Sequence, residues 1–97
     1  MITVETEKGE RLQSMDEFHE ILELVERAFT KLSILKWIDP YGDTTFNQVQ
    51  IREVEQELSV LKEVAESSVE HSSLAKFEEL VRFCRSGVHR YLKFYGD

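Results

Sequence analysis

Apolar residues recur every three or four positions along most of the chain, which is the spacing of a buried helix face. The first such series begins after Ser14 and continues to Trp37. Ser14 and Glu17 also match a capping box, in which each side chain accepts a backbone amide at the start of a helix. Pro40 disfavours helical geometry in the residue before it. We therefore predict a first helix over residues 14–37, with an apolar face of Phe18, Ile21, Leu22, Val25, Ala28, Phe29, Leu32 and Leu35.

A second series predicts a helix over residues 46–66. Thr45 and Gln48 match another capping box at its start. The main apolar face then steps by three and four residues and consists of Ile51, Val54, Leu58, Leu61 and Ala65. A second apolar strip lies roughly opposite and consists of Val49, Val60 and Val64. This helix is therefore expected to be buried on both sides or to present one strip to a partner.

The third series predicts a helix over residues 73–95, after a loop over the serine-rich residues 67–72. Its apolar face consists of Leu74, Phe77, Val81, Cys84, Val88, Tyr91 and Tyr95. Gly87 lies within the series and costs about 1 kcal/mol relative to alanine in a helix. A glycine there admits close approach of another backbone, so a second packing groove is expected along Phe83, Gly87 and Phe94.

Residues 1–13 show a different pattern, because Ile2 and Val4 alternate with polar residues. An isolated short strand is marginal in water. This arm is therefore expected to be a strand paired elsewhere, a strand paired with another copy, or a loosely ordered segment. Together with a corner over residues 38–45, the predicted elements form an all-α, three-helix antiparallel bundle with a short N-terminal arm or strand. Short connections favour antiparallel neighbours, and the chain of 97 residues is expected to form a single domain.

Composition agrees with a folded protein, since 41% of the residues are hydrophobic and ten are aromatic. No apolar run reaches the roughly 18–20 residues that span a bilayer, and residues 1–10 lack the features of a signal peptide. The single cysteine, Cys84, cannot form an internal disulfide. On an apolar helix face it is expected to be a buried, reduced thiol in a cytoplasmic protein, whereas a nucleophile would need a base and an exposed thiolate.

The net charge of −7 is unevenly distributed. Residues 1–70 contain sixteen acidic and seven basic residues, whereas residues 71–97 contain three acidic and five basic ones. We expect no nucleic-acid and no membrane partner, because phosphate groups are bound by lysine and arginine. Acidic surfaces suit a basic protein partner, although acidity also serves solubility alone. Cations of the predicted third helix, namely Arg82, Arg85, His89 and Lys93, are expected to face the acidic helices within the fold or across a dimer.

The segment WIDPYGDTTFN, residues 37–47, is the most unusual stretch of the chain. It lacks the alternating acids and the final glutamate of a calcium loop, and it has neither the glycines nor the lysine of a phosphate loop. Asp39, Pro40, Tyr41 and Gly42 instead match a turn. The segment is therefore predicted to be a structural corner that closes the end of the bundle. An alternative keeps Asp39, Tyr41 and Asp43 exposed as a binding tip.

No catalytic, metal or cofactor site is predicted. His19, His71 and His89 have no second histidine or cysteine one helical turn away, which zinc sites commonly require. Paired carboxylates such as Glu53 and Glu57 are placed on outward faces, where no desolvated pocket would shift their pKa values.

The segments WIDPYGDTTFNQVQ and VHRYLKFYGD resemble a family of small, mostly uncharacterised bacterial proteins with an "IDPYGDT-FN" segment and a "VH-YLKF-GD" C-terminus. The resemblance covers residues 38–48 and 88–97. The family brings no activity to this chain, though small acidic proteins of this kind are often suspected to be immunity or accessory proteins. The resemblance implies that the corner and the tail form one structural unit, with Asp39–Asp43 close to Phe94–Asp97.

The leading hypothesis is a non-enzymatic protein-binding module, such as an immunity-like or regulatory protein, whose acidic helices cover a basic partner. Its predicted binding residues are Asp16, Glu20, Glu23, Tyr41, Asp43, Glu53 and Glu57, with Tyr41 as an aromatic anchor. A structural homodimer is the second hypothesis, built through Val49, Val60 and Val64 or through Phe83, Gly87 and Phe94. A small-ligand or enzymatic site at Asp39–Asp43 and the tail is the third.

Overall fold

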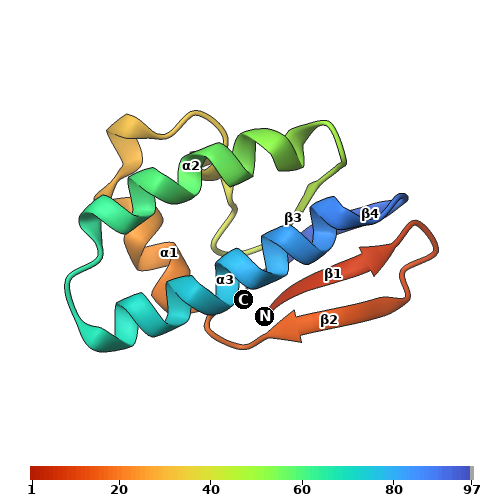
Figure 1. The fold of residues 1–97 in the computed structure, drawn as a ribbon, viewed down its shortest axis with the longest axis horizontal. Helices are drawn as coiled ribbons and strands as arrows, with labels where there is room; N and C mark the ends of the chain where they lie inside the picture. Colours follow the sequence, from red (N-terminus) through yellow and green to blue (C-terminus); the bar gives the residue numbers. More distant parts are fainter. Residues whose placement is uncertain (97) are drawn as a thin grey trace.

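The computed structural model describes residues 1–96 and contains a four-stranded antiparallel sheet with three α-helices (Figure 1). The all-α, three-helix bundle predicted from the sequence is therefore wrong. The strands are β1 (Ile2–Thr6), β2 (Arg11–Met15), β3 (Asp43–Phe46) and β4 (Arg90–Tyr95). The helices are α1 (Phe18–Arg27), α2 (Gln50–Val64) and α3 (Ser68–Ser86), and two short 3-10 turns, η1 (Phe29–Lys31) and η2 (Leu35–Trp37), follow α1.

The N-terminal segment is the centre of the sheet. The strand order is β2-β1-β4-β3, so β1 pairs with β2 on one side and with β4 on the other. Ile2 lies opposite Phe94 and Val4 opposite Leu92, and all four side chains are buried. The predicted alternation of Ile2 and Val4 is thus a strand, and its partners lie within the same chain.

The first predicted helix, over residues 14–37, is too long at both ends. Ser14 lies in β2 opposite Thr3 and caps no helix. The helix begins at Phe18 and ends at Arg27, and the remaining residues form η1, η2 and their connection. Residues 28–37 still bury Ala28, Leu32 and Leu35, whereas Phe29 of the predicted apolar face is 49% exposed. The apolar spacing therefore indicated burial at three of these four positions and was wrong about a continuous α-helix.

The second predicted helix begins four residues later than expected. Thr45 lies in β3 opposite Lys93, so the predicted capping box of Thr45 is wrong. The reciprocal pair is formed by Asn47 and Gln50 instead. The Asn47 side chain accepts the Gln50 amide at 3.0 Å, and the Gln50 side chain accepts the Asn47 amide at 2.9 Å.

The third predicted helix, over residues 73–95, combines a helix and a strand. The predicted loop over residues 67–72 is the start of α3, where Ser67 and Glu70 form a capping box. The helix ends at Ser86 before Gly87, and β4 begins at Arg90. Between them His89 has a φ of 56°, which turns the chain out of the helix direction.

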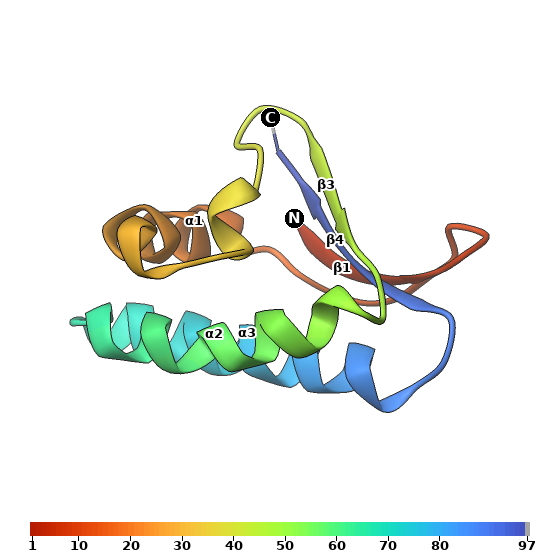
Figure 2. The same ribbon diagram turned by 90° about the horizontal axis from the view of Figure 1, so that it is seen from above.

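The helices cover one face of the sheet, and Figure 2 shows α2 and α3 side by side in one layer. Phe94 of β4 lies at the centre of the core. Its ring centroid lies 6.3 Å from that of Phe18, 5.7 Å from that of Phe46 and 5.9 Å from that of Phe77. None of the helices in the described chain is long and apolar enough to cross a membrane.

Candidate interaction surfaces

The solvent-facing side of α1 carries an acidic surface, which we define as Glu20, Glu23 and Glu26. These residues, with His19 and Leu22, line a shallow hollow of about 350 Å³. Glu23 and Glu26 are exposed and Glu20 is half-buried. Within residues 1–96, no ion pair involves any of the three carboxylates. The structure therefore brings two predicted binding residues, Glu20 and Glu23, together with Glu26.

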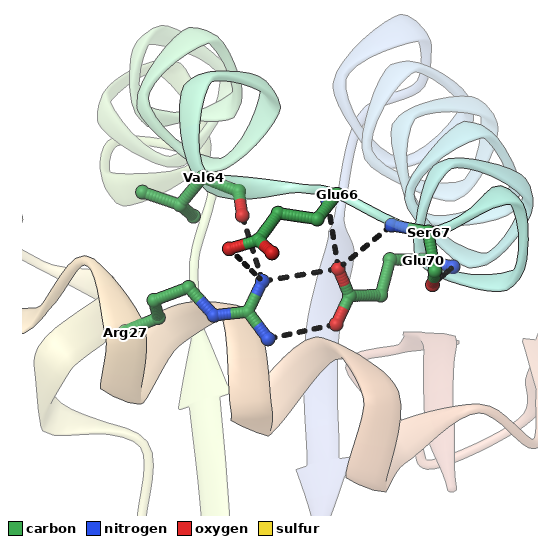
Figure 3. Close-up of polar contacts among 5 residues, drawn as sticks. All are labelled: Arg27, Val64, Glu66, Ser67 and Glu70. Carbon is green, nitrogen blue, oxygen red and sulfur yellow. Dashed lines mark hydrogen bonds and ion pairs between the residues drawn. The ribbon is translucent and has the colours of Figure 1, made fainter.

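Arg27, at the end of α1, neutralises a different acid from the one that helix spacing favours. Glu23 lies four residues before Arg27, the favourable order for an ion pair on a helix. The guanidinium instead forms two parallel hydrogen bonds with Glu70 of α3, at 3.0 and 2.8 Å, and a third with the Val64 carbonyl at 2.7 Å (Figure 3). Glu23 therefore forms no ion pair with Arg27, whose charge acts on it only at longer range.

This Arg27–Glu70 contact joins α1 to the connection between α2 and α3. The hydrogen bond from Arg27, followed by those from the backbone amides of Glu66 and Ser67, lowers the pKa of Glu70 to about 2. Figure 3 shows the carboxylate of Glu70 placed between the guanidinium and these amides. Glu70 is therefore ionised at any physiological pH and serves as both a helix cap and an ion-pair partner.

The remaining acids predicted to bind a partner lie apart from one another. Asp16 is exposed just before α1, and its neighbour Glu17 pairs with Lys76 of α3. Glu53 is exposed in the first turn of α2. These acids therefore do not form the single acidic face on helices 1 and 2 that was predicted from the sequence.

Glu57 is turned into the protein, so its predicted role as an exposed partner-binding residue is wrong. Only 7% of the residue is exposed. Its carboxylate accepts the backbone amides of Ser33, Ile34 and Leu35, the last two at 3.1 and 2.9 Å. The amides of residues 33–35 therefore have hydrogen-bond partners outside a regular helix.

The corner over residues 38–45 contacts the C-terminal tail directly. Gly96 donates its amide to the Gly42 carbonyl at 2.8 Å, and Asp43 lies opposite Tyr95 in the β3–β4 pair. The proximity implied by the family resemblance is thus confirmed for residues 94–96, and Asp97 lies outside the described residues. A Cβ added at Gly96 would lie 2.6 Å from the Pro40 carbonyl oxygen, so no ligand fits between loop and tail at this point.

Two residues of the corner are available to a partner. Tyr41 is 82% exposed and Asp43 is exposed at the start of β3. Asp39 accepts the Tyr41 amide at 2.9 Å, and the Thr44 hydroxyl accepts the Asp39 amide at 2.9 Å, which fixes the turn. Of the apolar side chains that could close the end of the core at this corner, Ile38 and Phe46 are buried, whereas Trp37 and Tyr41 are exposed.

The face of the sheet opposite the helices carries a buried carboxylate that the sequence did not indicate. Glu5 on β1 is 5% exposed and accepts the hydroxyls of Thr3, at 2.6 Å, and of Tyr95. Burial raises the pKa of Glu5, but these hydrogen bonds and the charges of Lys93 and Arg11 lower it overall. The alternation of β1 was the one pattern that could have placed Thr3 and Glu5 together on this face.

Most of the predicted dimer residues are used inside the fold. Phe94 is fully buried, and Val60 and Val64 are partly buried against the core. Phe83 is half-buried, and the Arg90 guanidinium lies over its ring at 4.1 Å. Gly87 ends α3, and Val49 alone of the six is fully open, at 82% exposure. Neither predicted strip is a continuous exposed apolar surface.

The cations that were assigned to one helix are divided between elements. Arg85 pairs with Glu55 of α2, as predicted for contacts with the acidic helices, and Arg82 pairs with Glu78 of its own helix. His89 approaches Glu7 at 3.8 Å. Lys93 lies in β4 on the outer sheet face.

The predicted buried thiol is confirmed. Cys84 is fully buried in α3, and this burial raises the pKa of the thiol to about 11. At neutral pH the residue is therefore a protonated thiol rather than a nucleophilic thiolate. Among residues 1–96, no group of three or more metal-ligating side chains gathers.

Comparisons with known proteins add no assignment to these surfaces. No protein-family model matches the chain, and neither a curated protein nor a solved structure matches it. The resemblance to a small bacterial family stays a prediction.

Proposed function

We propose that this protein is a non-enzymatic protein-binding module that covers a basic partner protein with its acidic surface on α1. The observation that carries the proposal is the group of three carboxylates, Glu20, Glu23 and Glu26, none of which forms an ion pair within residues 1–96. Their spacing of three residues places neighbouring charges within reach of each other, and like charges at this spacing destabilise a helix by a few tenths of a kcal/mol per pair.

The cation nearest in sequence is committed elsewhere, which supports the proposal. Arg27 could relieve the repulsion through Glu23, but its guanidinium is bound to Glu70. A partner that presents lysine and arginine side chains would neutralise the acidic surface and speed association by electrostatic attraction. An immunity-like or regulatory protein that covers the basic site of another protein fits this mode of binding.

Two further features belong to the proposal. Tyr41, with its exposed ring on the corner, is the candidate aromatic anchor, since tyrosine is enriched among energetically important interface residues. A reduced, cytoplasmic setting is supported by the single cysteine, Cys84, which is buried as a thiol.

The test is a pull-down from extract of the native host with three forms of the full chain. One is the wild type and the second is E20Q/E23Q/E26Q, which removes the acidic surface. The third, E10Q/E63Q/E79Q, removes the same charge at three exposed acids outside α1, none of which forms an ion pair within residues 1–96. Each form is used at about 50 and about 150 mM salt. The Debye length shortens from about 14 Å to about 8 Å between these concentrations, which weakens contacts between exposed charges.

The expected result is a basic protein retained by the wild type and by E10Q/E63Q/E79Q, and lost with E20Q/E23Q/E26Q. Retention should also fall at the higher salt. Retention of the same proteins by both triple variants, or retention of no basic protein by the wild type, would overturn the proposal.

A further inference from the structure

We propose that the outer edge of β3 accepts an extended, basic segment of a partner protein as a fifth strand. This inference rests on the proposed function only for the charge of the partner. Its structural basis is separate, because β3 is an edge strand that pairs, among residues 1–96, with β4 alone. Figure 2 shows β3 as the outermost strand, on the side of the sheet away from β1.

Backbone geometry identifies the free hydrogen-bonding groups. Gly96 donates to Gly42, so residue 42 directs its backbone toward β4. Alternate residues of a strand direct their backbone groups to opposite sides. Asp43 and Thr45 therefore point their amides and carbonyls away from the sheet, and both residues are exposed. These amides and carbonyls can form the main-chain hydrogen bonds that hold an added strand at a sheet edge.

The opposite edge of the sheet is less suitable. In β2 the pairing with β1 shifts between Val4 and Glu5, which leaves Leu12 as an extra residue. Such a bulge twists an edge away from further pairing. Arg11 also places a positive charge on this edge, which would repel a basic segment. The pairing of β3 with β4 runs without such a shift.

The charge around β3 determines the kind of segment. Asp43 is its first residue and Asp39 lies in the turn before it, and neither forms an ion pair within residues 1–96, although Lys93 of β4 attracts Asp43 at longer range. A segment with lysine or arginine at alternate positions would pair its backbone with Asp43 and Thr45 and its charges with these acids. A second copy of the chain fits poorly, since two β3 edges would bring four aspartates together. The exposed ring of Tyr41 adds an apolar contact beside the strand.

The test uses proline, which removes a backbone amide but is tolerated on an edge strand where that amide faces solvent. Thr45→Pro removes one outward amide of β3. Ser14→Pro is the matched control, because Ser14 lies opposite Thr3 in β2 and occupies the outward position of the other edge. The probe is a synthetic seven-residue peptide of alternating lysine and valine. A second peptide, methylated on its central backbone nitrogens, has the same charge and cannot pair as a strand.

Amide NMR spectra of the full chain are recorded during titration with each peptide. We expect the amides of Asp43 and Thr45 to shift and to exchange at least tenfold more slowly with the pairing peptide. Thr45→Pro should bind it at least tenfold more weakly, Ser14→Pro should bind it like the wild type, and the methylated peptide should leave both amides unchanged. If the Gly96 amide of Thr45→Pro stays protected from hydrogen exchange, as its hydrogen bond to Gly42 requires, the β3–β4 pair is intact in this variant.

Several results would overturn the inference. Amide shifts confined to α1 would support binding at the acidic surface and would contradict strand addition at β3. Amide shifts at β3, without any partner in the pull-down, would support strand addition and would contradict the proposed function. Equal perturbation of Ser14, equal effects of the two peptides, or no binding would contradict pairing at β3. Concentration-dependent shifts of Asp43 and Thr45 without peptide would assign the edge to a second copy.

Discussion

Replacing Glu57 with alanine should destabilise the fold far more than replacing an exposed acid. The carboxylate of Glu57 accepts three backbone amides, those of Ser33, Ile34 and Leu35, and two of these residues are buried. A hydrogen bond to a charged group contributes about 1.5–3 kcal/mol, and an orphaned buried amide costs about 1–3 kcal/mol. Solvent reaches the exposed Ser33 and reduces the loss there. We therefore expect Glu57→Ala to lower the free energy of unfolding by about 3–5 kcal/mol.

This loss is large against the roughly 5–15 kcal/mol that holds a small domain together. Urea denaturation monitored by circular dichroism measures it, with the midpoint and slope fitted separately. Glu53→Ala is the matched control, because Glu53 lies one turn earlier on α2 and is exposed. Its effect should stay within about 0.5 kcal/mol. A Glu57→Ala loss below about 1 kcal/mol would refute the inward role of this carboxylate.

Three further outcomes test separate parts of the fold. Ser67→Ala should cost about 1 kcal/mol of unfolding free energy by removing the cap of α3, whereas Ser72→Ala, at an exposed position within the same helix, should cost nothing measurable in urea denaturation. Gly96→Ala should lower the thermal midpoint and speed hydrogen exchange of the residue 96 amide, because a Cβ there would lie 2.7 Å from the Gly42 carbonyl oxygen. Glu70 has a folded pKa of about 2, below its ordinary value of 4.5, so its contribution is present above about pH 4.5 and is lost as the pH falls toward 2. Stability between pH 5 and 2 should therefore fall less steeply in Glu70→Gln than in the wild type, and equal slopes would contradict the pKa.

The sequence predicted burial better than it predicted secondary structure. Leu74, Phe77, Val81 and Cys84 step at helical spacing and are buried on α3, as expected. The same spacing continues through Val88 to Tyr91 and Tyr95, yet Val88 is 81% exposed and β4 follows the alternation of Leu92 and Phe94 instead. The helical spacing of three or four residues and the strand alternation of two residues overlap in this stretch. The helical series is longer, so it concealed the strand.

Contacts between distant residues decided what local patterns could not. Ser14 and Thr45 each matched a capping box, but both lie in strands. Ser14 pairs with Thr3 across the β1–β2 turn, and Thr45 pairs with Lys93, which is distant in the sequence. The amides of residues 33–35 are bound outside a regular helix by Glu57, more than twenty positions away. No spacing along the chain indicates such a contact.

The candidate surfaces were predicted only in part. Glu20 and Glu23 lie on an exposed acidic surface as expected, and Tyr41 is exposed on the corner. The availability of the acidic surface depends on Arg27 contacting Glu70 of a different helix. The edge of β3 could not be foreseen from a sequence interpreted as helical, since the edge exists only once β1 and β4 have formed the sheet.

The most direct test of the proposed function is the affinity of the captured partner for four forms of this protein, measured by calorimetry at about 50 mM salt. We expect equal affinity for the wild type and E10Q/E63Q/E79Q. Binding should be at least tenfold weaker for E20Q/E23Q/E26Q and for Thr45→Pro. Equal affinities for all four forms would contradict binding through α1 and the β3 edge.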